Sequence, residues 1–171
     1  LQLSNGTTVR YAQLFKCEQV LRSDCNRGVS GIDGSTSTAA GAACVGEEMT
    51  VLITGDMSFS YDVNGLSSTY LSPRFKIIVM CNGGGGIFRF IKPTSDLPEL
   101  ETCFEIHRDI SVEKYADLFG LRYFELNDEK SAAEVLSLFF AEKDRPAILA
   151  VHTPNVYNAE VLRGYFRRSR Q

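Results

Sequence analysis

Two short runs that are apolar at almost every position, TVLIT (50–54) and IIVM (77–80), constrain the fold of this chain most. A strand with one face in water alternates apolar and polar residues, whereas a strand covered on both faces is apolar throughout. Segments of helical period lie between these runs and further strand-like runs, a pattern typical of parallel strands joined by crossover helices. We therefore predict an α/β domain, a doubly wound, mostly parallel sheet with helices on both faces.

The positions of the expected elements follow from apolar runs and from capping residues. We expect strands at 19–23, 49–54, 76–81, 121–126 and 147–152. We expect helices at 8–17, 35–45, 61–71, 112–119, 129–143 and 156–167. Segment 90–109 contains two prolines and no clear periodicity, so we expect an irregular segment that can act as a mobile active-site loop.

The size and charge of the chain limit the classes of protein to which it can belong. The 171 residues, of which 44% are hydrophobic, fit one domain that spans residues 1–171. A net charge of −3 predicts no broad cationic face, so nucleic acid is not an expected partner. Four arginines near the end, Arg163, Arg167, Arg168 and Arg170, are expected to complement the dipole of the last helix.

The cysteines and the ends of the chain suggest where the protein works. The five cysteines are an odd number without C-x-x-C spacing, which favours neither zinc nor a disulfide framework. No apolar run is long enough for a membrane span. We therefore expect a cytoplasmic protein. The sequence opens at Leu1 without Met, and we expect it to be the C-terminal part of a longer enzyme.

Polar and glycine residues follow two neighbouring strands of the predicted sheet. Asp56 comes after the second strand, and Asn82 followed by four glycines (83–86) comes after the third. Ligands of open α/β sheets bind at the carboxyl ends of the strands. Carboxylate, amide and main-chain oxygens favour a hard cation such as Mg²⁺, and exposed backbone N–H groups hold phosphate. Taken alone, Asp56 could be a helix cap, Asn82 a turn residue and the glycines a flexible turn. The joint pattern favours a site for a metal-bridged diphosphate.

The runs GDMS (55–58) and CNGGGG (81–86) resemble the bipartite motif of thiamine diphosphate enzymes, Gly-Asp-Gly followed some two dozen residues later by Asn-Asn. Met57 replaces the last Gly, and Cys81 replaces the first Asn. The resemblance implies thiamine diphosphate as cofactor, with Mg²⁺ or Mn²⁺ held by Asp56, Asn82 and the main-chain carbonyl of Gly84, and with Ser58 at the diphosphate.

The first loops are similar to those of a narrower group. SNGTTVR (4–10) and DCNRGVSGIDGSTSTAAGAA (24–43) resemble the diphosphate-binding domain of the SEPHCHC synthases (2-succinyl-5-enolpyruvyl-6-hydroxy-3-cyclohexene-1-carboxylate synthases) of menaquinone biosynthesis. This resemblance implies a transferase that decarboxylates 2-oxoglutarate and adds the succinyl unit to isochorismate. It further implies a pyrimidine-binding domain supplied by a second subunit, in a homodimer or homotetramer. We therefore expect residues 1–171 alone to be inactive.

The resemblance also assigns roles to residues of this sequence. Ile32 would lie under the bent cofactor, Ser30 would offer its carbonyl to the aminopyrimidine, and Phe88 would form an apolar wall. Arg10 and Arg27 would pair with substrate carboxylates. The expected cofactor-binding residues are Asn5, Gly6, Ser30, Gly31, Ile32, Gly55, Asp56, Ser58, Asn82, Gly84, Gly85, Gly86 and Ile87. The expected catalytic residues are Ile32, Arg27 and Arg10, and those at the substrate are Arg10, Arg27 and Phe88. Gly6 stands where the group often has Ser.

Simpler interpretations and other functions stay open from the sequence. Ile32 could be a core residue, and Arg10 and Arg27 could form surface ion pairs. His107 and His152 show no partner spacing and are expected to be structural. One alternative function is another thiamine diphosphate enzyme, a 2-oxoacid decarboxylase or an acetolactate synthase. The other is a non-catalytic α/β nucleotide-binding domain.

Overall fold

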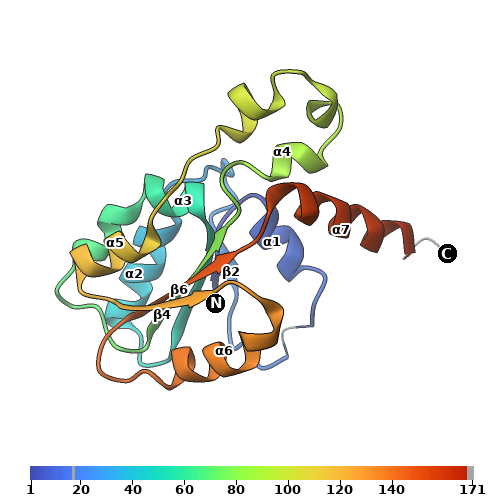
Figure 1. Cartoon of the computed structure of the whole chain (residues 1–171). Helices are drawn as coiled ribbons and strands as arrows, with labels where there is room; N and C mark the ends of the chain where they lie inside the picture. Colours follow the sequence, from blue (N-terminus) through green and yellow to red (C-terminus); the bar gives the residue numbers. More distant parts are fainter. Residues whose placement is uncertain (17, 169–171) are drawn as a thin grey trace.

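A single parallel sheet organises the molecule (Figure 1). The computed structural model describes residues 1–16 and 18–168. The strand order is β2-β1-β3-β4-β6-β5, and every neighbouring pair is parallel. The strands are β1 (Gln2–Leu3), β2 (Asp24–Cys25), β3 (Thr50–Gly55), β4 (Phe75–Cys81), β5 (Arg122–Leu126) and β6 (Ala147–His152). The predicted fold class is confirmed.

Helices connect the strands and cover the sheet. They are α1 (Thr7–Ala12), α2 (Ser35–Val45), α3 (Asp56–Tyr61), α4 (Ile87–Phe90), α5 (Val112–Phe119), α6 (Ala132–Ala141) and α7 (Asn155–Arg168). Short 3-10 turns occupy Val63–Ser67, Thr94–Asp96 and Glu129–Ser131, and a π-helical turn occupies Leu100–Glu105. None of the helices that the structure describes is both long and apolar enough to cross a membrane.

The strand order decides which face each helix covers. The chain moves one way across the sheet from β1 to β2 and from β5 to β6, and the opposite way from β2 through β3 and β4 to β5. Crossovers between parallel strands are right-handed, so reversing the direction moves the connecting helix to the other face. Helices α2, α3 and α5 therefore share one face, and α1 and α6 share the other (Figure 1).

Each face has its own hydrophobic core. On the first face, Ala39 of α2, Phe59 of α3 and Ala116 of α5 belong to the larger cluster with Ile77 and other strand residues. On the second face, Phe139 of α6 packs with Ala147 and Leu149 of β6. Alternate residues of β4 enter the two clusters, which explains why this strand is apolar at successive positions.

The capped helices and the central strands lie where the sequence predicts them. Ser111 Oγ accepts a hydrogen bond from the backbone N–H of Lys114, and Gly120 ends α5 in the left-handed region. The carboxylate of Asp128 likewise accepts from the N–H groups of Lys130 and Ser131 before α6. These signals are local, so the sequence alone is sufficient to place them.

The arginines near the end of the chain have different surroundings. Arg167 and Arg168 lie in the last turn of α7, where cations complement the helix dipole as expected. Arg163 lies earlier in the helix, and its guanidinium donates to the carbonyl of Arg89 in α4. Arg170 lies outside the described residues. The dipole interpretation therefore applies to two of the three arginines that the structure describes.

Two predicted elements are wrong, and a third is shorter than expected. The expected strand at 19–23 is irregular and exposed, with Leu21 at 85% exposure, and the first two strands are instead β1 and β2. The expected helix at 61–71 starts earlier, as α3, and becomes a 3-10 turn after Asp62. The carboxylate of Asp62 is bonded to Ser37 of α2, and Gly65 packs directly against Ser37, so a tertiary contact ends the helix. The helix expected at 8–17 ends at Ala12, and Cys17 lies outside the described residues.

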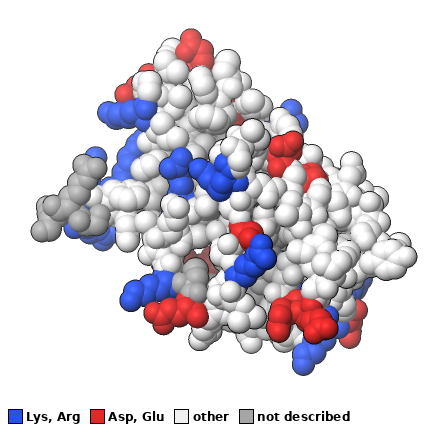
Figure 2. Space-filling view, turned by 180° about the vertical axis from the view of Figure 1, so that it is seen from behind, with Lys and Arg blue, Asp and Glu red and all other residues white. Residues whose placement is uncertain are grey.

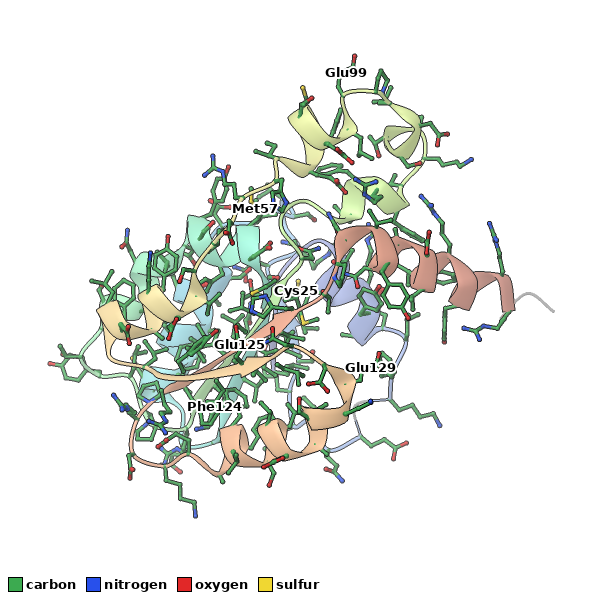
Figure 3. The ribbon with its side chains drawn as sticks, viewed as in Figure 1. Cys25, Met57, Glu99, Phe124, Glu125 and Glu129 are labelled. Carbon is green, nitrogen blue, oxygen red and sulfur yellow. The ribbon has the colours of Figure 1, made fainter. Side chains whose placement is uncertain are left out.

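The segment predicted to be irregular forms an arm, defined here as residues 91–109, above the carboxyl edge of the sheet (Figure 1). It holds a 3-10 turn and the π-helical turn, so its backbone is more regular than expected. In Figure 3 Glu99 marks the tip of the arm, and Met57 at the start of α3 lies below it. The arm returns to the sheet where the N–H of Arg108 donates to the carbonyl of Gly83, at 3.2 Å.

Candidate functional site

The carboxyl ends of the central strands meet beneath the arm. Gly55 of β3 is in register with Met80 of β4, and Cys81 is in register with His152 of β6. Ser4 Oγ, just after β1, accepts a hydrogen bond from the N–H of Gly55 at 3.3 Å. The loops that follow β1, β3, β4 and β6 therefore lie side by side.

Asp56 joins two of these loops. Its side chain is buried, and its carboxylate accepts hydrogen bonds from the backbone N–H groups of Met57 (2.7 Å), Asn82 (3.0 Å) and Gly83 (2.7 Å). Burial raises the pKa of Asp56, and these hydrogen bonds oppose the rise. Asp56 is the first residue of α3 and accepts from one N–H of its first turn, but its other two donors belong to the loop after β4, so a helix-end role alone does not account for this carboxylate.

Three oxygen atoms converge at this point: Asp56 Oδ1, the side-chain oxygen of Asn82 and the carbonyl oxygen of Gly84. A nitrogen atom at the position of the Asn82 side-chain oxygen would lie 3.2 Å from Asp56 Oδ1 and 3.0 Å from the carbonyl oxygen of Gly84. Such a cluster of acceptors is unfavourable by itself, so the Asn82 amide would turn over unless other contacts hold it or a cation lies among the oxygens. Oxygens of an octahedral Mg²⁺ shell, 2.0–2.1 Å from the ion, are roughly 3 Å apart. The spacing therefore fits the metal that the sequence predicts.

This oxygen set differs from a site made of charged ligands. Among the described residues, no group of three or more His, Cys, Asp or Glu side chains could hold a metal ion. A site with one carboxylate, one amide and one main-chain carbonyl leaves half of the charge of a divalent cation uncompensated. An anionic ligand such as a diphosphate would supply the rest.

The glycines after Asn82 are required by neighbours of the loop. Gly83 and Gly84 have φ angles of +82° and +146°, which L side chains rarely adopt. A Cβ on Gly84 would collide with the carbonyl oxygen of Glu105, and one on Gly86 would collide with the side chain of Asn155. The N–H of Gly85 donates to the Glu105 carbonyl at 2.8 Å. The arm and α7 thus touch this backbone directly.

The loop after β2 is attached to the same edge. Asn5 Nδ2 donates to the carbonyls of Asn26 (2.8 Å) and Gly31 (2.6 Å), and Asn5 Oδ1 accepts from the guanidinium of Arg27 at 2.8 Å. Ser58 Oγ donates to the carbonyl of Ile32. The structure therefore brings together five of the predicted site residues, Asn5, Arg27, Gly31, Ile32 and Ser58.

Ile32 and its neighbour have the character of a binding loop. Ile32 is 37% exposed and belongs to neither hydrophobic cluster, so the core interpretation does not account for it. Ser30 has a φ of +57°, which is uncommon for a residue with a side chain. Such outliers gather at functional sites.

The three residues predicted at the substrate lie on the surface. Phe88 is 36% exposed and packs against Phe104 of the arm, with ring centroids 5.5 Å apart. Arg10 lies in the last turn of α1, and Arg27 lies beyond β2. Among the described residues, neither arginine forms an ion pair, so the surface-ion-pair interpretation is not realised. Both guanidiniums can therefore meet an anion.

Two cavities open at this edge. The smaller, of about 400 Å³, adjoins the oxygen cluster and is lined by Asp56, Cys81, Asn82, Gly83, His107, Arg108, Asp109, Ile110, Asn127, His152, Thr153 and Pro154. The larger, of about 750 Å³, is mostly apolar and lies over the second face of the sheet, between α1 and the start of α6. Five residues line both cavities, Asn82, Asn127, His152, Thr153 and Pro154. The cavities are thus neighbours.

Several residues of this edge were missed by the sequence interpretation. His107 lies against Gly83, and His152 Nε2 lies 3.1 Å from Glu125 Oε1. Both histidines were expected to be structural, and both line the smaller cavity. Asn155 and Glu105 adjoin the glycine loop. Asn155 follows β6, so inspecting every strand end would have found it. No sequence signal distinguishes Glu105 within the arm.

Comparison with known proteins points to the same kind of site as the geometry does. Residues 5–151 match the family model described as "Thiamine pyrophosphate enzyme, C-terminal TPP binding domain". Proteins named 2-succinyl-5-enolpyruvyl-6-hydroxy-3-cyclohexene-1-carboxylate synthase are similar over nearly the whole chain. That of Flavobacterium johnsoniae is 44% identical, with 98% of this chain and 30% of the relative covered. That of Porphyromonas gingivalis is 47% identical, with 97% and 29% covered. The chain therefore spans about 30% of the length of these relatives.

Proposed function

The chain belongs to the thiamine pyrophosphate enzymes as their C-terminal TPP-binding domain, and on that basis we propose that it holds the metal and diphosphate of thiamine diphosphate within a SEPHCHC synthase. The relatives carry that name, but the chain covers about 30% of their length. The activity of the whole enzyme is therefore part of the proposal. The convergence of Asp56 Oδ1, Asn82 Oδ1 and the Gly84 carbonyl is the observation that carries it.

Different residues at the strand ends would bind the metal, the diphosphate and the remainder of the cofactor. Asp56, Asn82 and Gly84 would hold Mg²⁺ or Mn²⁺, and Ser58 and the loop of residues 84–87 would lie beside the diphosphate. The N–H groups of Gly85 and Gly86 already donate to the carbonyls of Glu105 and Gly84 and are not part of this contact. Asn5 and Gly6 would adjoin it from β1, and the exposed Ile32 would support the cofactor from the loop after β2. When bound, thiamine diphosphate supplies a carbon nucleophile and an electron sink for decarboxylation of a 2-oxoacid.

The substrates in this proposal are 2-oxoglutarate and isochorismate, which both carry two carboxylates. Arg10 and Arg27 have guanidiniums without acidic partners among the described residues, and a guanidinium can bind a carboxylate through two parallel hydrogen bonds. Phe88 and Ile87 would form an apolar wall beside the reacting carbon. The arginines would select dicarboxylates over pyruvate.

The remaining parts of the proposal concern the setting of the domain. Residues 1–171 would act as one domain of a longer chain whose pyrimidine-binding domain, from a second subunit, completes each site in a homodimer or homotetramer. A cytoplasmic location accords with the free state of the four described cysteines, Cys25, Cys44, Cys81 and Cys103. On the face shown in Figure 2, acidic and basic residues are interspersed, which accords with partners other than nucleic acid.

Thermal unfolding with and without thiamine diphosphate and Mg²⁺ tests the proposal. A ligand at 100 times its Kd stabilises a protein by about 2.7 kcal/mol, so the melting temperature of the chain should rise. Asp56→Ala should abolish the rise because it removes the only carboxylate of the predicted metal site. ADP with Mg²⁺ is the control, since a nucleotide-binding domain would be stabilised by it. Stabilisation by ADP alone, or none by thiamine diphosphate in the full-length protein, would contradict the proposal.

A further inference from the structure

Glu105 in the arm is an unusual neighbour for the predicted metal site. It is 5% exposed, and its carboxylate accepts hydrogen bonds from the guanidinium of Arg89, including one of 2.7 Å from Nε. Its remaining partner is Asn155 at the start of α7, whose Nδ2 donates to Glu105 Oε1 at 3.0 Å. An ionised carboxylate only accepts hydrogen bonds. The Asn155 amide must therefore direct its nitrogen toward Glu105.

This constraint passes to Asn82. With its nitrogen toward Glu105, Asn155 presents its oxygen on the other side, where it accepts from Asn82 Nδ2 at 3.2 Å. The nitrogen of Asn82 is then fixed toward Asn155. Its oxygen is left facing Asp56 Oδ1 and the carbonyl oxygen of Gly84.

The local contacts of Asn82 favour the opposite orientation. If the amide were turned over, its nitrogen would donate to Asp56 Oδ1 at 3.2 Å and to the Gly84 carbonyl at 3.0 Å. Its oxygen would then oppose Asn155 Oδ1 at 3.2 Å, with no hydrogen atom between them. The contact with Asn155 thus opposes the turned-over orientation of the Asn82 amide. In that orientation the amide nitrogen would donate to the two oxygens that are predicted to bind the cation.

We propose that Asn155, oriented by Glu105, is a positioning residue that keeps the Asn82 oxygen aimed at the metal. The inference rests on the proposed function, because the oxygen has a purpose only if a cation binds there. Partners of metal ligands fix the orientation of those ligands, and their loss typically weakens metal binding 10–100-fold. The arm would thereby contribute to the site through Glu105, whose carboxylate contacts Asn155.

Paired substitutions separate this directional role from a merely structural one. Glu105→Gln keeps the shape but allows Asn155 and Asn82 to turn over, so Mn²⁺ affinity in the presence of thiamine diphosphate should fall about tenfold or more. Electron paramagnetic resonance of Mn²⁺ in the full-length protein measures that affinity. Glu101→Gln is the matched control, because Glu101 also pairs with Arg89 (2.9 Å) but is exposed and has no hydrogen bond to Asn155. It should leave the affinity within about twofold of wild type.

A double substitution tests the direction of the hydrogen bonds themselves. When Glu105→Gln is combined with Asn155→Asp, the introduced glutamine amide can donate to the introduced carboxylate, which can only accept from Asn82. The Asn82 oxygen would again face the metal, so the double variant should recover most of the affinity that Glu105→Gln loses. Unfolding of each variant without metal serves as the folding check. Equal affinity of Glu105→Gln and Glu101→Gln, or no recovery in a folded double variant, would overturn the inference.

A measurement without metal distinguishes this inference from the proposed function. Asn82 Nδ2 lies close to Gly86, since a Cβ on Gly86 would be 2.5 Å from it. In nuclear magnetic resonance spectra of the metal-free protein, the Asn82 amide protons should show a nuclear Overhauser effect to the Gly86 α-protons, weakened by Glu105→Gln. Its absence in the wild type would overturn the positioning role even if Mn²⁺ binds. Its presence without Mn²⁺ binding would uphold the orientation while the proposed function fails.

Discussion

At the scale of single residues, Arg10 and Arg27 carry the proposed selection of dicarboxylates. Arg10→Ala or Arg27→Ala in the full-length enzyme should raise KM for 2-oxoglutarate roughly tenfold or more, because hydrogen bonds to charged groups contribute about 1.5–3 kcal/mol. Use of pyruvate should change much less. Steady-state decarboxylation with each substrate measures both effects.

Arg22 provides the control for these two substitutions. It is exposed and pairs with Asp24 at the amino end of β2, away from the loops that hold the site. Arg22→Ala should leave both KM values near those of wild type. An equal rise in KM for pyruvate and 2-oxoglutarate in the Arg10 or Arg27 variants would contradict the assigned role.

Cys81 stands where the family motif has an Asn, and its environment should make it unreactive. Burial, helped by the charge of Asp56, raises the pKa of its thiol to about 12. The thiolate is the nucleophile, so at pH 8 only a minute fraction of Cys81 is reactive, and that fraction should grow tenfold per pH unit until the pKa is reached. Iodoacetamide at pH 8 should label the exposed Cys44 and Cys103 first, as read by peptide mass spectrometry. Labelling of Cys81 at the same rate would show that its thiol is not protected.

Which residues of the site can be predicted from sequence depends on their distance from a strand end. Asp56, Asn82 and Gly84 follow apolar strands directly, so the rule for parallel sheets brings them together. Glu105 reaches the same loop from the arm, and only the folded structure reveals that its carboxylate bonds to Asn155. No periodicity encodes that contact.

At the scale of elements, the glycine loop and the arm form one structural unit. Gly84→Ala should destabilise the chain by about 2 kcal/mol or more, because a φ of +146° is strained for alanine and its Cβ would collide with the Glu105 carbonyl. Gly41→Ala in α2 is the control, since nothing lies within 4 Å of the added carbon. It should stabilise the helix by about 0.5–1 kcal/mol. Urea unfolding measures both, and equal effects of the two substitutions would refute the packing argument.

Elements were predicted well where local signals define them and poorly where tertiary contacts do. Helix α5 has its own cap and stop, so its limits are those expected. Strands β1 and β2 have two residues each, too few for any period, and exist because β1 pairs with both β2 and β3. The run at 19–23 has strand-like residues but no place in the sheet.

At the scale of the whole molecule, the chain should be a binding unit without turnover. Its relatives are more than three times as long, and in the proposed function a second domain helps to activate the cofactor. Residues 1–171 should therefore release no CO₂ from 2-oxoglutarate above background, while the full-length protein should do so. A carbon dioxide assay on both proteins at equal concentration decides this. Turnover by residues 1–171 alone would contradict the proposed half-site.

The fold class could be predicted from the apolar runs, because a strand buried on both faces is apolar at successive positions in its own sequence. Strand order and the two cavities did not follow, since they depend on how distant segments cross. The larger cavity, for example, combines Leu3, Ile53 and Val161, which come from three remote parts of the chain.

All strands of the sheet run the same way, so every amino end lies at the edge opposite the proposed site. The exposed turns at 46–49 and 143–145, which precede β3 and β6, belong to that distant edge. Exposed turns tolerate insertion well. An affinity tag or a fluorophore placed there would let the protein be immobilised on a sensor surface with its binding loops facing the solution.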